Sequence, residues 1–270
     1  METASRLKKP VIAAVKQAAK RMTKRPFTVA QKDSASNLVT SADLAVQAFL
    51  RERLCRLLPG SGFFGEEGDA AGADTPYLWV VDPIDGTCNF SRGIEECAIS
   101  VALLKDNRAV LGVVYNPFRD HLFSAVKGQG ACLNGKPIHV SNATFEEGLL
   151  CTAMSLYRKD LADTCVGIIA DAYEQCNDVR RFGAAALELC YLAAGLCDLY
   201  FEIRIFPWDY AAASLVLSEA GGILRGYDGE ELTFDRATPL IGANSMENHG
   251  RLNAIVKAHM PIMPYEEILR

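Results

Sequence analysis

The side chains best placed for chemistry are two aspartates three positions apart, Asp82 and Asp85, which follow an apolar run. The run at 79–81 is short and β-branched or aromatic, which is typical of a strand buried in a sheet. Pro83 has no N–H and keeps Asp82 out of the helical conformation. We therefore expect Asp82 at the end of that strand, followed by a turn in which the carbonyl of Ile84 is free to bind a ligand.

The next two residues, Gly86 and Thr87, suit an anion. Glycine lets the backbone approach an anion closely, and the threonine hydroxyl can cap a helix, orient a water molecule or contact a phosphate. Carboxylates beside exposed N–H groups require a cation and an anion together. The segment therefore predicts a combined metal and phosphate site.

Further acids occur in two other motifs. Glu66 and Glu67 lie between glycines a few residues before the first motif, which would let two loops converge. Asp209 precedes the apolar run 211–217, a pattern that predicts a helix with an acid in its first turn. Mg²⁺ prefers carboxylates, backbone carbonyls and retained waters to imidazole or thiolate. The acids that fit such a hard cation are Glu66, Asp82, Asp85 and Asp209.

Each acid taken alone also has a structural explanation. A Glu-Glu pair in a glycine turn is usually a solvated loop, and an aspartate before a helix is usually its cap. Asp43 lies in the first turn of a helix that we expect from Ser41, where an acid complements the helix dipole. The combination of the motifs, rather than any single acid, favours a functional site.

These motifs resemble the inositol monophosphatase family of Mg²⁺-dependent, Li⁺-sensitive phosphatases. The family carries a Gly-Glu-Glu turn, a Trp-X-X-Asp-Pro-Ile/Leu-Asp-Gly-Thr-X-Asn-Phe motif and a Trp-Asp-X-Ala-Ala helix start leading to Glu-Ala-Gly-Gly. They occur here in family order at 65–67, 79–90 and 208–222. The segments 37–43 and 181–185 extend the resemblance over nearly the whole chain.

The resemblance implies hydrolysis of a phosphate monoester by a metal-activated water, without a covalent intermediate. It implies two or three Mg²⁺ ions per active site. One ion would be held by Glu66, Asp82 and the Ile84 carbonyl, and a second by Asp82, Asp85 and Asp209.

The resemblance also assigns catalytic roles. Thr87, supported by Asp43, would orient the water and help to deprotonate it, and the N–H groups of Gly86 and Thr87 would receive phosphate oxygens. Glu67 would act through a water. Lys32 lies in a polar loop near the expected site, where a solvated lysine is the simpler interpretation. The implied catalytic set is Thr87, Asp43, Glu66 and Asp82.

The implied substrate contacts are Asp85, Gly183, Ala184, Ala185, Glu202 and Asp209. Ala184 stands where Ser or Thr is usual, which removes a hydroxyl, and Arg204 stands where glycine is common. Arg204 would either receive a second anion near the leaving-group pocket or lie on its rim. We expect inositol 1-phosphate as the substrate, with fructose 1,6-bisphosphate, 3′-phosphoadenosine 5′-phosphate, NADP and histidinol phosphate as alternatives.

Other enzyme classes fit less well. No cysteine is followed six positions on by arginine, so the thiol phosphatase motif is missing. The acids are spaced Asp-X-X-Asp rather than the Asp-X-Asp of haloacid dehalogenase phosphatases, and no nucleoside triphosphate loop is present. A non-catalytic metal- and phosphate-binding regulatory module is the alternative from a different class.

Composition limits the partners. The net charge of −5 without basic blocks disfavours nucleic acid and anionic membranes, and no apolar run is long enough to span a bilayer. The first residues lack the order of a secretory signal, which favours the cytoplasm. Nine cysteines without Cys-X-X-Cys indicate reduced thiols. The expected partner is a small phosphorylated metabolite, and the resemblance suggests a homodimer.

Periodicity predicts an order of elements that is α+β or α/β. The resemblance implies a layered α/β/α/β/α sandwich of the inositol monophosphatase/fructose-1,6-bisphosphatase type. We expect an α+β lobe at 1–142 that carries most metal ligands, and an α/β lobe at 143–270 that carries Asp209 and the substrate contacts. Helices are expected at 11–22, 41–58, 159–175 and 184–194. Strands are expected at 98–104, 109–115, 121–126 and 198–202, with a hairpin turn at Asn134-Gly135 between 130–133 and 137–140.

Overall fold

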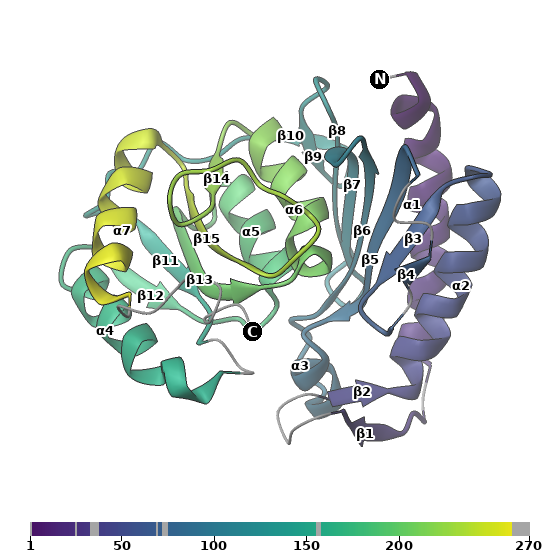
Figure 1. Ribbon diagram of the computed structural model, residues 1–270, viewed down its shortest axis with the longest axis horizontal. Helices are drawn as coiled ribbons and strands as arrows, with labels where there is room; N and C mark the ends of the chain where they lie inside the picture. The colour runs from purple at the N-terminus through teal and green to yellow at the C-terminus, as the bar shows by residue number, and fades with distance from the viewer. Residues whose placement is uncertain are drawn as a thin grey trace.

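The computed structural model describes residues 2–24, 26–32, 38–68, 70–71, 75–154 and 158–260. Helices and two large sheets alternate in five layers: α1 and α2, the larger sheet, α5 and α6, the smaller sheet, then α4 and α7 (Figure 1). This confirms the expected α/β/α/β/α sandwich. The helices are α1 (Glu2–Met22), α2 (Ser41–Leu57), α3 (Thr87–Arg92), α4 (Ala162–Tyr173), α5 (Ala185–Ala193), α6 (Pro207–Glu219) and α7 (Met246–His259), with a 3₁₀ turn, η1, at Lys159–Leu161.

The larger sheet has eight strands in the order β10-β9-β8-β7-β6-β5-β3-β4. Neighbouring strands are antiparallel except β3 and β5, which run parallel and so end at the same edge. The strands are β3 (Gly62–Gly65), β4 (Ala70–Ala71), β5 (Tyr77–Asp85), β6 (Ala98–Lys105), β7 (Arg108–Asn116), β8 (His121–Val126), β9 (Ala131–Leu133) and β10 (Lys136–Ile138). A separate pair joins β1 (Val29–Gln31) to β2 (Leu38–Thr40).

The smaller sheet has five strands in the order β12-β11-β13-β15-β14. Its central strand β13 is parallel to β11 and antiparallel to β15. The chain passes from one sheet to the other between Ile138 and Leu149. The lobe boundary expected at 142 falls in this connection and stays a prediction. The strands are β11 (Leu149–Thr152), β12 (Asp178–Arg180), β13 (Leu199–Ile205), β14 (Ile223–Arg225) and β15 (Thr238–Ala243).

Helix α6 lies between the sheets and is apolar on nearly every side. Residues 210–217 are all buried, as expected for a helix enclosed in a core. Gly112 of β7 permits close packing, because a Cβ at that position would lie 2.4 Å from the carbonyl oxygen of Ala212. This packing carries Asp209, at the start of α6, to the junction of the two sheets.

Most expected elements are confirmed. Thr40 caps α2, which begins at Ser41 as predicted, and β6, β7 and β8 match their predicted spans within about two residues. The hairpin turn joins β9 to β10, with φ of 50° at Asn134 and 78° at Gly135. Asn-Gly tolerates this left-handed conformation, which explains why the local sequence predicts the hairpin well.

The predicted start of the first helix is wrong. Helix α1 begins at Glu2, and Pro10 lies inside it. The buried positions Ala4, Leu7 and Val11 recur at helical spacing on both sides of the proline. Packing of this apolar face on α2 and the larger sheet outweighs the backbone hydrogen bond that Pro10 cannot make.

The predicted end of the strand at 79–81 is also wrong. Strand β5 continues through Pro83 to Asp85, with a register shift between Asp82 and Asp85. A bulge is where a sheet accepts proline, because the ladder hydrogen bonds are already interrupted there. The irregularity also re-aims the two carboxylates, so Asp82 belongs to a bulged strand rather than to a strand end.

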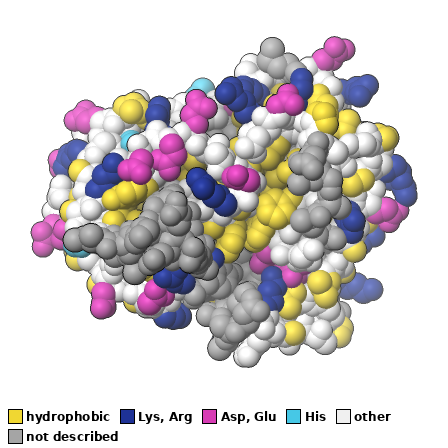
Figure 2. Space-filling view, in the orientation of Figure 1, with side chains coloured by type: hydrophobic (Ala, Val, Ile, Leu, Met, Phe, Trp, Pro, Cys, Tyr) yellow, Lys and Arg dark blue, Asp and Glu magenta, His cyan; other side chains and the backbone are white. Residues whose placement is uncertain are grey.

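Figure 2 shows acidic and basic side chains interspersed on one face of the molecule. Hydrophobic side chains gather near the middle of this view, between α6 and the larger sheet. None of the helices in the described part of the chain is long and apolar enough to cross a membrane. All nine cysteines belong to the described part and are free thiols.

Candidate active site

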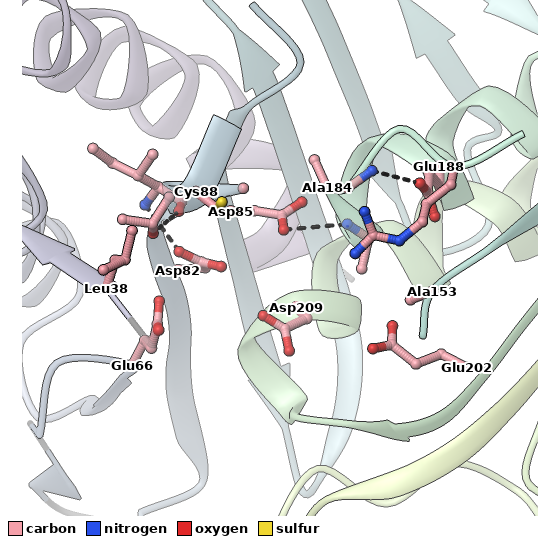
Figure 3. Close-up of a pocket in the computed structure, with 16 residues that line it drawn as sticks. Leu38, Glu66, Asp82, Asp85, Cys88, Ala153, Ala184, Glu188, Glu202 and Asp209 are labelled. Carbon is pink, nitrogen blue, oxygen red and sulfur yellow. Dashed lines mark hydrogen bonds between the residues drawn. The ribbon is translucent and has the colours of Figure 1, made fainter. Parts of the chain in front are cut away.

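Three aspartates from two distant segments meet in one cavity (Figure 3). Asp82 and Asp85 come from the bulge of β5, and Asp209 comes from the first turn of α6. One carboxylate oxygen from each lies within 4.8 Å of the others. Asp82 and Asp85 are buried and Asp209 is half-buried. The structure therefore brings together three of the four acids that the sequence singles out for a metal.

The electrostatics of this cluster favour a cation. Burial, and then the charges of neighbouring acids, raise the pKa of Asp82 and of Asp209 well above the ordinary range. Burial and the charge of Glu66 raise the pKa of Asp85 to about 7, against hydrogen bonds from Ala186 and Ala185 that lower it. Buried carboxylates without a counter-charge repel one another. The all-oxygen donor set and this uncompensated charge fit Mg²⁺.

Glu66 follows β3 and lines the same cavity, because β3 and β5 run parallel and end side by side. Its backbone N–H donates to the carbonyl of Val81 at 3.2 Å. Its Oε1 atom lies 3.0 Å from Nζ of Lys32, which also lies 2.7 Å from Oε1 of Glu67. A lysine ammonium therefore bridges the acid pair that the sequence predicts near the metal site.

The two partners of Lys32 differ in their surroundings. Burial raises the pKa of Glu67 to about 7 although the Lys32 hydrogen bond opposes it. Burial alone would lower the pKa of Lys32, but Glu66 and Glu67 outweigh burial and raise it. Glu67 is also held through its backbone, which exchanges two hydrogen bonds with the Gln47 side chain at 3.0 and 3.2 Å. The loop that carries Glu66 is thus fixed to helix α2.

Thr87 occupies the centre of a short hydrogen-bond chain. Its hydroxyl lies 2.9 Å from the carbonyl oxygen of Ile84 and 3.3 Å from Oδ1 of Asp43. Asp43 is buried, and its other oxygen accepts hydrogen bonds from the N–H and hydroxyl of Thr40. Burial raises the pKa of Asp43 to about 6, against these hydrogen bonds. Asp43 therefore has two functions, capping α2 and contacting Thr87.

Gly86 precedes Thr87 and forms the turn into α3 in a left-handed conformation, with φ of 84°. A Cβ at Gly86 would lie 2.9 Å from the carbonyl oxygen of Glu96, so a side chain is excluded by space as well as by conformation. The backbone of 86–87 faces the same cavity as the carboxylates. The backbone of this turn and the carboxylates thus share one cavity, and anion binding by Gly86 and Thr87 stays a prediction.

The wall opposite the bulge comes from the second half of the chain. It includes Gly183, Ala184, Ala185 and Glu202, the positions that the sequence predicts for substrate contacts. The N–H of Ala185 donates to Asp85 at 3.2 Å. Glu202 lies on β13. These residues share one cavity with the aspartates, and their contacts to a substrate stay a prediction.

Two charged residues of this wall are missing from the sequence-based set, Arg181 and Glu188. Oε1 of Glu188 accepts the N–H groups of Phe182 and Gly183, and burial raises the pKa of Glu188 to about 8. The sequence carries only a weak signal for these two residues. Arg181 begins the family segment 181–185, and Glu188 is an acid within the apolar helix α5.

Glu202 is held by Tyr200, whose hydroxyl donates to Oε2 at 2.8 Å. Burial raises the pKa of Glu202 to about 7, while Tyr200 and Arg181 oppose this shift. Arg204 does not line the cavity: its guanidinium lies over the ring of Phe206, 4.7 Å from the centroid. The structure therefore does not place Arg204 in the cavity wall.

Comparison with known proteins agrees with this geometry. A sequence model of the inositol monophosphatase family matches residues 1–260 of the chain. "Nus factor SuhB" of Escherichia coli (strain K12) is 39% identical over 202 residues, which are 74% of this chain and 76% of that protein. "Inositol-1-monophosphatase" of Synechocystis is 37% identical over 232 residues, 85% of this chain and 80% of that protein.

Solved structures share the fold. The inositol monophosphatase structure from Anabaena (Nostoc) has a TM-score of 0.83 and 30% sequence identity, and the match covers 96% of this chain and 98% of that chain. The family match spans both sheets and all the motifs that meet in the cavity. The chain therefore belongs to the inositol monophosphatase family and is a phosphoric monoester hydrolase.

Proposed function

We propose that the chain is a Mg²⁺-dependent phosphatase that hydrolyses inositol 1-phosphate. The observation that carries the proposal is the meeting of Asp82, Asp85 and Asp209 within 4.8 Å of one another beside the Gly86 turn. Burial and the charges of neighbouring acids raise the pKa of each of these carboxyl groups, which supports a bound cation. A divalent cation and a phosphate dianion satisfy both halves of this arrangement.

The acids would bind metal ions in two groups. Asp82, Asp85 and Asp209 would hold one ion, and Glu66, Asp82 and the Ile84 carbonyl another, with a total of two or three ions per site. Bound Mg²⁺ supplies Lewis acidity toward the phosphoryl group and lowers the pKa of an attacking water. The Thr87 hydroxyl would orient that water, because its proton is directed to the Ile84 carbonyl and Asp43, which leaves its oxygen lone pairs to accept from the water.

Backbone N–H groups and Asp43 would bind the phosphate and assist proton transfer. The N–H groups of Gly86 and Thr87 receive phosphate oxygens, since the left-handed turn at Gly86 leaves the backbone open to an anion. Asp43, whose pKa is raised to about 6, accepts a proton through Thr87 and so assists deprotonation of the water. No side chain in this scheme becomes phosphorylated.

Charge on the opposite wall favours a leaving group rich in hydroxyls. Glu202 and Glu188 line that wall with one arginine, Arg181, and Arg204 lies elsewhere. Carboxylates accept hydrogen bonds from hydroxyl groups but repel a second phosphate. We therefore rank inositol 1-phosphate above fructose 1,6-bisphosphate, 3′-phosphoadenosine 5′-phosphate and NADP. Histidinol phosphate, whose leaving group is cationic, remains the nearest competitor.

Family resemblance supports further features of this proposal. We expect a homodimer, location in the cytoplasm, and inhibition by Li⁺ in place of the Mg²⁺ held by Asp82, Asp85 and Asp209. The relatives named "Nus factor SuhB" favour a second candidate, a role as a protein factor in addition to phosphatase activity or in place of it.

A substrate panel separates these possibilities. Inorganic phosphate release is measured with and without Mg²⁺ from inositol 1-phosphate, fructose 1,6-bisphosphate, 3′-phosphoadenosine 5′-phosphate, NADP and histidinol phosphate. We expect the highest kcat/KM for inositol 1-phosphate. Preference for a bisphosphate would overturn the charge argument, and no turnover of any compound would favour the non-catalytic role.

A further inference from the structure

The segment 182–186 contributes Gly183, Ala184 and Ala185 to the cavity wall, and four of its backbone N–H groups bond to side chains. Those of Phe182 and Gly183 donate to Oε1 of Glu188 at 2.6 and 2.9 Å. Those of Ala185 and Ala186 donate to the two oxygens of Asp85 at 3.2 and 2.8 Å. Side-chain acceptors, rather than a sheet partner, therefore determine the shape of the segment at these residues.

Asn89 fixes the same segment from the other half of the chain. Its amide nitrogen Nδ2 donates to the carbonyl of Phe182 at 2.6 Å and to the carbonyl of Glu96 at 2.8 Å. Asn89 belongs to α3, the helix that begins at Thr87. One side chain thus links the helix that follows the phosphate-binding turn to the wall of the leaving-group pocket, 93 positions away in sequence.

The fit between these parts is tight. A Cβ at Gly86 would lie 3.1 Å from Cβ of Ala184 and 3.2 Å from the carbonyl oxygen of Gly183. Gly183 itself has φ of 80°, and a Cβ there would lie 3.2 Å from Nδ2 of Asn89. The turn and the segment therefore contact each other directly, and a shift of the segment changes the distance between the two sites.

We propose that Asn89 and Glu188 are positioning residues that hold the 182–186 segment against the phosphate-binding turn, and thereby set leaving-group specificity. The inference rests on the proposed function only for the identity of the substrate. In holding the segment, Glu188 acts through its acceptor oxygen Oε1 rather than through its charge. Asn89 acts as a double donor, so both of its amide protons are required.

The two residues predict different responses to substitution. Asn89→Ala removes two hydrogen bonds, and Asn89→Asp places a carboxylate against two carbonyl oxygens. Glu188→Gln keeps an oxygen that accepts both N–H groups, whereas Glu188→Leu leaves Phe182 and Gly183 without an acceptor. Asn248→Ala is a matched control, because it also removes two Nδ2 hydrogen bonds, to Ala143 and Asn244, away from the cavity.

Kinetics on two esters provide the first test. For inositol 1-phosphate we expect kcat/KM to fall ~100-fold in Asn89→Ala, further in Asn89→Asp, and ~100-fold in Glu188→Leu. For p-nitrophenyl phosphate, whose leaving group has no hydroxyls for the wall to bind, we expect losses below ~5-fold. Asn248→Ala should stay within ~3-fold of the wild type on both esters, and Glu188→Gln should keep a kcat/KM for inositol 1-phosphate at least ~10-fold above that of Glu188→Leu. Equal losses on the two esters, or a Glu188→Gln variant as impaired as Glu188→Leu, would overturn the proposal.

Hydrogen exchange of the metal-free protein provides a test that needs no substrate. Amides in a peptide covering 181–187 should exchange at least ~10-fold faster in Asn89→Ala and in Glu188→Leu, and at the wild-type rate in Glu188→Gln and Asn248→Ala. Unchanged exchange in Asn89→Ala contradicts the positioning role. A wild-type protein that does not hydrolyse inositol 1-phosphate would refute only the substrate assignment, because the exchange result stands independently of it.

Discussion

Oδ2 of Asp85 accepts the backbone N–H of Ala186 at 2.8 Å, across 101 positions of sequence. Asp85 belongs to β5 of the larger sheet, and Ala186 belongs to α5, which packs on α6 between the sheets. A carboxylate of the proposed metal site is therefore also a tie between the two halves of the chain. The carboxylate of Asp82 differs: among the described residues, the backbone N–H that donates to it belongs to Ile84, two residues away.

This difference predicts opposite effects of two matched substitutions on the metal-free protein. Asp82→Asn removes a buried charge and should raise the free energy of unfolding by ~1–3 kcal/mol. Asp85→Asn leaves one of the two N–H groups of Ala185 and Ala186 facing an amide nitrogen, and should lower it by ~1–3 kcal/mol. Urea unfolding in EDTA measures both values. Both variants should lose Mg²⁺-dependent stabilisation, and equal effects of the two on stability would contradict the tie.

Stability of the metal-free protein should fall as pH rises. Asp85 has a folded-state pKa of about 7 against an ordinary value of 3.8, so between these values the folded state binds more protons than the unfolded state. Stability is then lost as pH increases through this window, and Asp82 and Asp209 shift in the same direction. Thermal melts in EDTA from pH 5 to pH 8 should show a declining Tm, and added Mg²⁺ should restore more at pH 8 than at pH 5. A Tm in EDTA that rises over this range would be inconsistent with an unpaired cluster.

Lys32 should compete with Mg²⁺ at Glu66. Its ammonium lies 3.0 Å from Oε1 of Glu66 and must separate from it when a metal binds there. Lys32→Met removes this competitor, so we expect the dissociation constant for Mg²⁺ to fall ~3–10-fold in calorimetric titrations. The same variant should lower the Tm of the metal-free protein, because Glu66 and Glu67 lose their counter-charge. The exposed Lys136→Met is the control, and unchanged or weaker Mg²⁺ affinity in Lys32→Met refutes the competition.

Thr87 should act through its hydroxyl alone. Thr87→Val keeps the shape and the backbone N–H but cannot contact Ile84 or Asp43, so we expect kcat to fall ~100-fold or more with little change in KM. Thr87→Ser keeps the hydroxyl and should lose less than ~10-fold. Steady-state kinetics of both variants test this. A loss confined to KM would show that Thr87 binds substrate instead of orienting the nucleophile.

Local sequence was a good guide where local chemistry decides the structure. The Asn134-Gly135 turn requires a left-handed conformation that few residue pairs adopt readily, and the apolar periods of α2 and β6 to β8 follow from burial on one or both faces. The convergence of Asp82, Asp85 and Asp209 could be expected only from the combination of motifs, because their meeting depends on how α6 packs between two sheets.

The misses have a common physical origin in tertiary packing. Pro10 lies inside α1 because the helix is held by its buried face, and Pro83 lies inside β5 because a bulge interrupts the ladder there. Arg181 and Glu188 carry only a weak sequence signal for a pocket, since tertiary packing of their segment brings them to the cavity. The Lys32 contact with Glu66 links two loops whose separation the sequence does not encode locally.

The most direct test of the central claim is release of inorganic phosphate from inositol 1-phosphate by the wild type and by Asp82→Asn, each in Mg²⁺ and in EDTA. The account predicts turnover by the wild type in Mg²⁺, none in EDTA, and a loss of at least ~1000-fold in Asp82→Asn at any Mg²⁺ concentration. Circular dichroism of Asp82→Asn should match the wild type, so the loss reports on chemistry. Turnover in EDTA, or an Asp82→Asn variant as active as the wild type, would contradict the claim that these acids hold the catalytic metal.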